Sequence, residues 1–228
     1  MIIAGTGFTG ATAVTFGLTP AAGFTVDSDT QITAIAPAGG PGTVGVTVTT
    51  PGGTSVPSPY LYIAAPTVLV LSPDAGPEGG GTPVVITGTG FNGATAVTFG
   101  ATPAVSFTVD NDNQITATAP IGVGAAGVTV TTSGGISNPG IYTYVPFPVI
   151  TGINPVSGPA AGGTAVTISG SNFTGATSVT FGGTPAASFT VDNDGQITAT
   201  TAAHAAGAVS VDVTTTGGTD SFASFTYL

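Results

Sequence analysis

The chain contains 228 residues, of which 41% are apolar and only 4% are charged. It has no Lys, Arg or Cys, and its ten Asp and Glu residues give a formal net charge of -10. Because Lys and Arg make most protein contacts to phosphate, this composition excludes nucleic acid and anionic membrane surfaces as partners. The lack of Cys excludes a disulfide framework, and no apolar run is long enough to predict a membrane span.

One block of sequence occurs three times, at a period of roughly 82 residues. Its copies run from Phe8 to Ala34, from Phe91 to Ala117 and from Phe173 to Ala199. A period of this length indicates an array of similar small domains. We therefore expect three modules, comprising residues 1–65, 66–146 and 147–228.

The first module begins partway through the repeated pattern. Residues 1–3 align with Val84–Ile86, so the first module has no counterpart of residues 67–83. It is therefore expected to lack its first strand and the connection that follows that strand. We expect the sequence to be a window from a longer array. The alternative is that another chain fills the gap by adding a strand.

The second module shows the complete set of elements. Its Val, Ile, Phe and Tyr residues alternate with polar residues at a period of two, as in strands with one buried face. The expected strands are residues 67–71, 83–87, 96–99, 106–109, 114–117 and the segments around 128–130 and 142–144. Residues 72–81 are expected to form a Gly/Pro-rich connection. Seven short strands without helical spacing predict an all-β, immunoglobulin-like antiparallel sandwich.

The third module repeats this pattern and ends on its own last strand, Phe225–Tyr227. In each module a glycine pair follows the Val-x-Val-Thr-Thr strand, where a tight reversal needs positive φ. These pairs are Gly52-Gly53, Gly134-Gly135 and Gly217-Gly218. The joints at residues 62–66 and 145–148 contain Pro and little Gly or Ser, which favours stiff connections. The sequence thus predicts tandem sandwiches arranged as a rod.

The third module carries a family resemblance. Residues 155–173 read Pro-x-Ser-Gly-Pro-x-x-Gly-Gly-Thr-x-Val-Thr-Ile-x-Gly-x-Asn-Phe and resemble the opening of IPT/TIG domains. The likeness continues through residues 179–186, 194–199 and 211–215, and it extends over all three modules from the second strand of the first. It is greatest with the bacterial extracellular type. This resemblance implies an immunoglobulin-like fold and a role as spacer, stalk or interaction module.

Paired acids recur at one place in every module. They are Asp27, Asp29, Asp110, Asp112, Asp192 and Asp194. Together with neighbouring Asn residues they offer hard oxygen ligands of the kind that calcium prefers. The alternative is a polar turn between two strands, which the repetition with the module favours. We therefore expect turn residues, and neither a metal nor a cofactor.

Other candidate chemistry is sparse. His204 is the only histidine, and its neighbours are Ala residues without an acid or nucleophile, so it is expected to be a loop residue. Sugar binding usually relies on exposed aromatic rings, but there is no Trp. The tyrosines occupy last-strand positions, where they are expected to pack inward or against the next module. They are Tyr60, Tyr62, Tyr142, Tyr144 and Tyr227.

These observations predict a non-enzymatic, extracellular or cell-surface structural protein, part of a fibre, filament, sheath or stalk. Such a protein acts by stiff extension and by self-association or contact with neighbouring modules. One alternative is a spacer, or a segment that binds carbohydrate or protein, in a larger adhesin or polysaccharide-active enzyme. Its partner would be a polysaccharide or a surface protein. A second alternative is a phage virion fibre or decoration protein.

Overall fold

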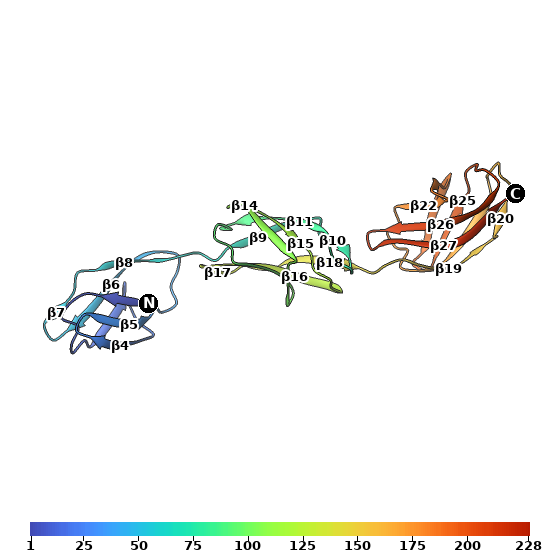
Figure 1. The fold of residues 1–228 in the computed structure, drawn as a ribbon. Coiled ribbons are helices and arrows are strands. Elements are labelled where there is room, and N and C mark those ends of the chain that lie inside the picture. The colour runs from blue at the N-terminus through green and yellow to red at the C-terminus, as the bar shows by residue number, and fades with distance from the viewer. The chain divides into compact units, whose positions relative to one another are not determined.

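The computed structural model describes residues 1–228 apart from the side chain of Ala223. Its regular elements, labelled in Figure 1, are β-strands. Among the described residues, no helix has the length and apolar character needed to cross a membrane. The strands form three modules, each with its own apolar core: module 1 around Phe16, module 2 around Phe99 and module 3 around Phe181.

Module 2 is a sandwich of two sheets. Its strands are β9 Thr67–Ser72, β10 Ala75–Pro77, β11 Pro83–Thr89, β12 Ala96–Phe99, β13 Thr102–Pro103, β14 Ser106–Asn111, β15 Gln114–Thr118, β16 Gly124–Thr132, β17 Gly135–Ile136 and β18 Gly140–Val145. One sheet has the order β9-β11-β15-β14. The other has the order β10-β18-β16-β12-β13, with β17 paired to β16.

The alternation expected from the sequence builds the core of this module. Val97 and Phe99 of β12 are buried, and Ala96 and Thr98, which alternate with them, are half-buried. Both sheets contribute to one cluster, in which Ile86 of β11 and Tyr142 of β18 have no exposed surface. The prediction of an immunoglobulin-like sandwich is therefore confirmed.

The connection predicted at residues 72–81 is wrong in one respect, because it contains the short strand β10. This strand runs parallel to β18, with Ala75 opposite Thr143. The Ala-Gly-Pro sequence of β10 has no alternation, so its pairing is not visible in the sequence. Module 3 has a similar parallel pair, β20 with β27.

Module 3 repeats the architecture. Its strands are β19 Val149–Asn154, β20 Ser157–Gly158, β21 Ala165–Ser171, β22 Ser178–Phe181, β23 Thr184–Pro185, β24 Ser188–Asn193, β25 Gln196–Thr200, β26 Gly207–Thr215 and β27 Gly218–Tyr227. The sheets have the orders β19-β21-β25-β24 and β20-β27-β26-β22-β23. Its core contains Ile168, Phe173, Phe181 and Phe225, none with any exposed surface.

Module 1 has a smaller first sheet. Its strands are β1 Ile2–Ala4, β2 Ala13–Phe16, β3 Thr19–Pro20, β4 Gly23–Ser28, β5 Gln31–Ile35, β6 Gly42–Thr50, β7 Gly53–Thr54 and β8 Ser58–Tyr62. The first sheet has the order β1-β5-β4, so β1 and β4 are its two edge strands. The second has the order β3-β2-β6-β7, with β8 paired to β6.

The glycine pairs take the conformation expected of them. Gly53, Gly135 and Gly218 have φ values of 127°, 126° and 132°, which are unfavourable for residues with a Cβ. Each lies at the reversal after β6, β16 or β26. The predicted turn chemistry is thus confirmed.

Candidate functional site

The first aspartate of each pair lies on an outer edge strand. In module 1 this is Asp27 of β4, at a β-bulge where the pairing with β5 shifts between Val26 and Ser28. Asp27 Oδ2 accepts hydrogen bonds from Gln31 Nε2 at 3.1 Å and from Thr33 Oγ1 at 2.7 Å. The carboxylate therefore ties the bulged edge strand to its neighbour.

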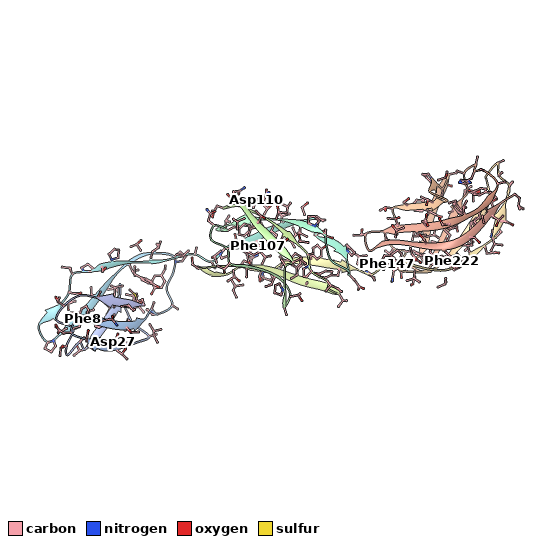
Figure 2. The ribbon with its side chains drawn as sticks, in the orientation of Figure 1. Phe8, Asp27, Phe107, Asp110, Phe147 and Phe222 are labelled. Atoms are coloured by element: carbon pink, nitrogen blue, oxygen red, sulfur yellow. The ribbon has the colours of Figure 1, made fainter. Side chains whose placement is uncertain are left out.

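Modules 2 and 3 reproduce this arrangement. Asp110 Oδ2 accepts from Gln114 Nε2 at 3.1 Å and Asp192 Oδ2 from Gln196 Nε2 at 3.1 Å. The corresponding threonine hydroxyls, of Thr116 and Thr198, donate at 2.8 and 2.7 Å. Asp27 on β4 and Asp110 on β14 are labelled in Figure 2.

These hydrogen bonds stabilise the charged carboxylates. The amide of Gln31, followed by the hydroxyl of Thr33, lowers the pKa of Asp27 below its ordinary value. The hydroxyl of Thr198, followed by the amide of Gln196, lowers the pKa of Asp192. A lowered pKa opposes a role in proton transfer near neutral pH, where a carboxyl group that acts as general acid or base needs a raised pKa.

The second aspartate of each pair accepts hydrogen bonds from the loop at the start of the repeated block. Asp29 accepts from the N–H of Gly7 at 3.3 Å, and its Oδ1 accepts from the Thr9 hydroxyl at 2.8 Å. Its backbone carbonyl accepts from the N–H of Phe8 at 2.9 Å. Phe8 belongs to the core, so we call this set of bonds the aspartate clasp.

The clasp recurs in the other modules. Asp112 accepts from the N–H of Asn92 at 3.2 Å, and Asp194 Oδ1 accepts from the Thr174 hydroxyl at 2.7 Å. The hydroxyl and N–H of Thr9 lower the pKa of Asp29, and those of Thr174 lower the pKa of Asp194. In both modules the clasp fixes the loop next to a core Phe. This residue is Phe91 in module 2 and Phe173 in module 3.

The two aspartates of a pair therefore serve different partners. Asp27 contacts side chains on β4 and β5, while Asp29 contacts the loop before β2. Their oxygens already accept hydrogen bonds from protein donors. Among the described residues, no three His, Asp or Glu side chains gather in a way that would hold a metal ion. The arrangement connects strands and loops.

The structure places His204 in the loop between β25 and β26. Its ring stacks on Tyr227, with centroids 5.0 Å apart and planes at 21°. Its Nδ1 lies 2.9 Å from the carbonyl oxygen of Ala205. These contacts give His204 a packing role at one end of module 3.

The tyrosines lie inside the modules. Tyr142, Tyr144 and Tyr227 are at most 4% exposed, and Tyr60 and Tyr62 are half-buried. Burial raises the pKa of Tyr62, Tyr144 and Tyr227. The expected inward packing is confirmed, so these rings do not form a platform for sugar stacking.

Alignment of the three modules missed two polar residues that hold the first strand, one in module 2 and one in module 3. In module 2, Asn138 Oδ1 accepts from the N–H of Val68 at 3.0 Å, and Asn138 Nδ2 donates to its carbonyl at 2.7 Å. In module 3, Asp220 Oδ2 accepts from the N–H of Ile150 at 2.6 Å. The two side chains occupy different repeat positions, so alignment of the modules does not reveal their common role.

Comparison with known proteins finds one domain family that matches all three modules. A model of the IPT/TIG domain matches residues 1–63, 66–144 and 148–227. Fibrocystin-L of Homo sapiens is 38% identical over 117 residues, which is 50% of this chain and 3% of that protein. The chain thus spans only a small part of this relative.

Two solved structures are similar at lower identity. SGBP-B, from a complex xyloglucan utilization locus in Bacteroides uniformis, is 24% identical with a TM-score of 0.34. The match covers 72% of this chain and 49% of that one. The plexin A4 extracellular region is 17% identical with a TM-score of 0.46, over 96% of this chain and 31% of that one.

Proposed function

Because the chain belongs to the IPT/TIG domain family over nearly its whole length, we propose that it is a non-enzymatic extracellular structural protein. Its modules extend and associate side by side in a fibre, filament, sheath or stalk. The fold itself hosts many functions, so the proposal rests on the surface of these particular modules.

The observation that carries the proposal is the chemistry of the outer edge strands. β4, β14 and β24 each end a sheet, and no Lys or Arg lies anywhere in the chain. Natural proteins usually protect such edges with Lys, because an exposed row of N–H and C=O groups pairs with other strands. Residues 23–26, 106–109 and 188–191 therefore offer uncharged edges of similar sequence, one in each module.

Electron microscopy of the purified chain tests this proposal. We expect regular filaments in concentrated samples. A variant with Thr25→Lys and Thr108→Lys, both exposed edge positions, should remain unassembled. The control, Leu18→Lys with Ala101→Lys, adds the same charge at exposed turns and should still assemble. Isolated monomers of the unmodified chain at high concentration would contradict the proposal.

One observation favours a second candidate, a spacer in a larger adhesin or polysaccharide-active enzyme. Each outer edge strand carries a β-bulge at its aspartate, at Asp27, Asp110 and Asp192. Bulges and edge charges both oppose pairing with another sheet. A chain that stays monomeric in the micrographs would support the spacer.

A further inference from the structure

Module 2 has an Asn-Gly dipeptide where the other two modules have Thr-Gly. Asn92 and Gly93 form an exposed turn directly after the core residue Phe91. The counterparts of Asn92 are Thr9 in module 1 and Thr174 in module 3. The aspartate clasp of module 2 therefore contains a side-chain amide where the other clasps contain a hydroxyl.

This exchange leaves the clasp of module 2 with fewer bonds. The hydroxyls of Thr9 and Thr174 donate to the clasp aspartates at 2.8 and 2.7 Å. Asn92 donates only its backbone N–H to Asp112, at 3.2 Å. Among the described residues, none forms a hydrogen bond with the side-chain amide of Asn92. This amide is therefore free to turn toward the backbone that follows it.

The backbone nitrogen of Gly93 is accessible as well. The turn is closed by Ala94, whose N–H donates to the carbonyl of Phe91 at 3.0 Å. No described group accepts a hydrogen bond from the N–H of Gly93. Gly93 has no Cβ that could hinder approach, and its φ is 73°. A nucleophilic nitrogen and an unbound amide carbon thus lie next to each other in the chain.

The other asparagines lack this combination. Asn138 and Asn154 precede proline, whose nitrogen carries no hydrogen. The remaining four precede residues that have a side chain, and each already forms a hydrogen bond through its own side chain. They are Asn111, Asn113, Asn172 and Asn193. Among the described asparagines, Asn92 alone combines an unbound amide with a following glycine.

We infer that Asn92 is a site of spontaneous covalent modification, which converts it to aspartate and isoaspartate. The deprotonated backbone nitrogen of Gly93 attacks the side-chain carbonyl carbon of Asn92. The C–N bond of the amide breaks, and its nitrogen takes a proton from water and leaves as ammonia. Water then opens the resulting succinimide ring at one of its two carbonyl groups, and the choice of carbonyl decides between aspartate and isoaspartate.

Both products alter the turn that holds Phe91. Isoaspartate routes the main chain through the former side chain and so adds one carbon atom to the turn that Ala94 closes. Either product places a new carboxylate near Asp112, and like charges repel each other. Because Phe91 has no exposed surface, a shift of this turn disturbs the core. Module 2 should therefore lose stability as the chain ages.

Peptide mass spectrometry of the stored full chain tests the reaction. The folded protein is incubated in mildly alkaline buffer, and chymotrypsin, which cuts after Phe91 and Phe99, then releases residues 92–99. We expect this peptide to change progressively from the Asn form to the Asp and isoaspartate forms. The rate should rise with pH, because the attacking nitrogen must lose its proton. The peptides that contain Asn113 and Asn172 should keep their amides.

Two variants test the effect on the clasp. Asn92→Thr restores the residue of the other modules, so it should raise the melting temperature by a few degrees and remove the loss of stability on storage. Asn92→Asp reproduces one product and should melt at a lower temperature than Ala101→Asp. The latter adds the same charge at an exposed turn away from the clasp. Circular dichroism of fresh and stored samples measures these melting temperatures.

Two results would overturn the inference. One is retention of the Asn form in residues 92–99 under conditions that convert the same peptide in the urea-unfolded chain, since the folded turn would then protect Asn92. The other is a largely converted chain that melts like the fresh one, since the core would then not depend on this turn. Neither result bears on filament assembly, which the proposed function requires and this reaction does not.

Discussion

At the scale of single residues, the aspartate clasp explains why an acid recurs near the end of every copy of the block. Asp194 holds the loop at residues 172–174, and through it the buried Phe173. We expect Asp194→Ala to lower the melting temperature of module 3 by several degrees. Asp194→Asn keeps an acceptor oxygen and should have a smaller effect. Circular dichroism measures both, and an unchanged melt for Asp194→Ala would contradict the role of the clasp.

The same carboxylates predict how stability depends on pH. Asp27, Asp29, Asp192 and Asp194 all have pKa values lowered by hydrogen bonds in the folded state. A lowered folded pKa gives stability that is present above the unfolded value of about 3.9 and is lost as pH falls through the folded pKa. We expect the melting temperature to decrease as the pH is lowered below about 4.

The variant with all four residues changed to Asn is the control for this pH dependence. It should have a flatter acid profile, because its side chains do not titrate. Equal acid profiles for the two proteins would show that other groups control the transition.

Calcium provides a third test at this scale. The oxygens of each aspartate pair face different protein donors, so an ion would have to replace existing hydrogen bonds. We expect the same melting temperature with calcium and with a chelator. A rise on addition of calcium that disappears in Asp110→Asn with Asp112→Asn would instead identify a metal site.

At the scale of elements, the close approach of the first strand to its neighbour is a sensitive point. Gly88 of β11 is buried, and a Cβ there would overlap Thr67 and the ring of Phe91. We expect Gly88→Ala to destabilise module 2 by about 3 kcal/mol, as for an overpacked core.

Gly5→Ala is the matched control, because the three atoms nearest to a Cβ at Gly5 all belong to the ring of Phe8. Its effect on the melting of module 1 should be smaller, since a ring can shift more easily than a paired strand. Equal losses of stability for Gly88→Ala and Gly5→Ala, measured by chemical denaturation, would show that the contact with Phe, and not the first strand, requires glycine at this position.

Most of the strands were predictable from the alternation of apolar and polar residues. The strand at residues 96–99 is found with the expected bounds, and that at residues 106–109 extends two residues further, to Asn111. Neither the pairing of β10 nor the bond between Asn138 and β9 was predictable. Both depend on contacts between segments far apart in the chain, and neither leaves a periodic pattern in the sequence.

The aspartate pairs illustrate the same limit at the candidate site. Their repetition pointed to turn residues, but the sequence did not separate the two aspartates of a pair. Asp27 bonds along its own hairpin, within six residues, and local turn chemistry suggests such a contact. Asp29 bonds to Gly7 and Thr9 across the module, and only the folded topology brings these residues together.

At the scale of the whole molecule, the net charge of -10 without any Lys or Arg governs association between copies. The acids of two copies repel each other, and no Lys or Arg side chain is present to form an ion pair between them. Salt screens exposed charges over about 10 Å at 0.1 M. Assembly driven by backbone pairing and apolar contact should therefore strengthen as salt is added.

We expect sedimentation at constant protein concentration to show more assembled chain at about 0.5 M than at about 0.01 M sodium chloride, since the Debye length falls from about 30 Å to a few ångströms. The Leu18→Lys and Ala101→Lys variant reduces the magnitude of the net negative charge by two and should need less salt, provided that repulsion is the barrier. Assembly that weakens with salt would require attraction between opposite charges. The side chains of this protein offer only His204 for that purpose, so such a result would contradict edge pairing as the basis of association.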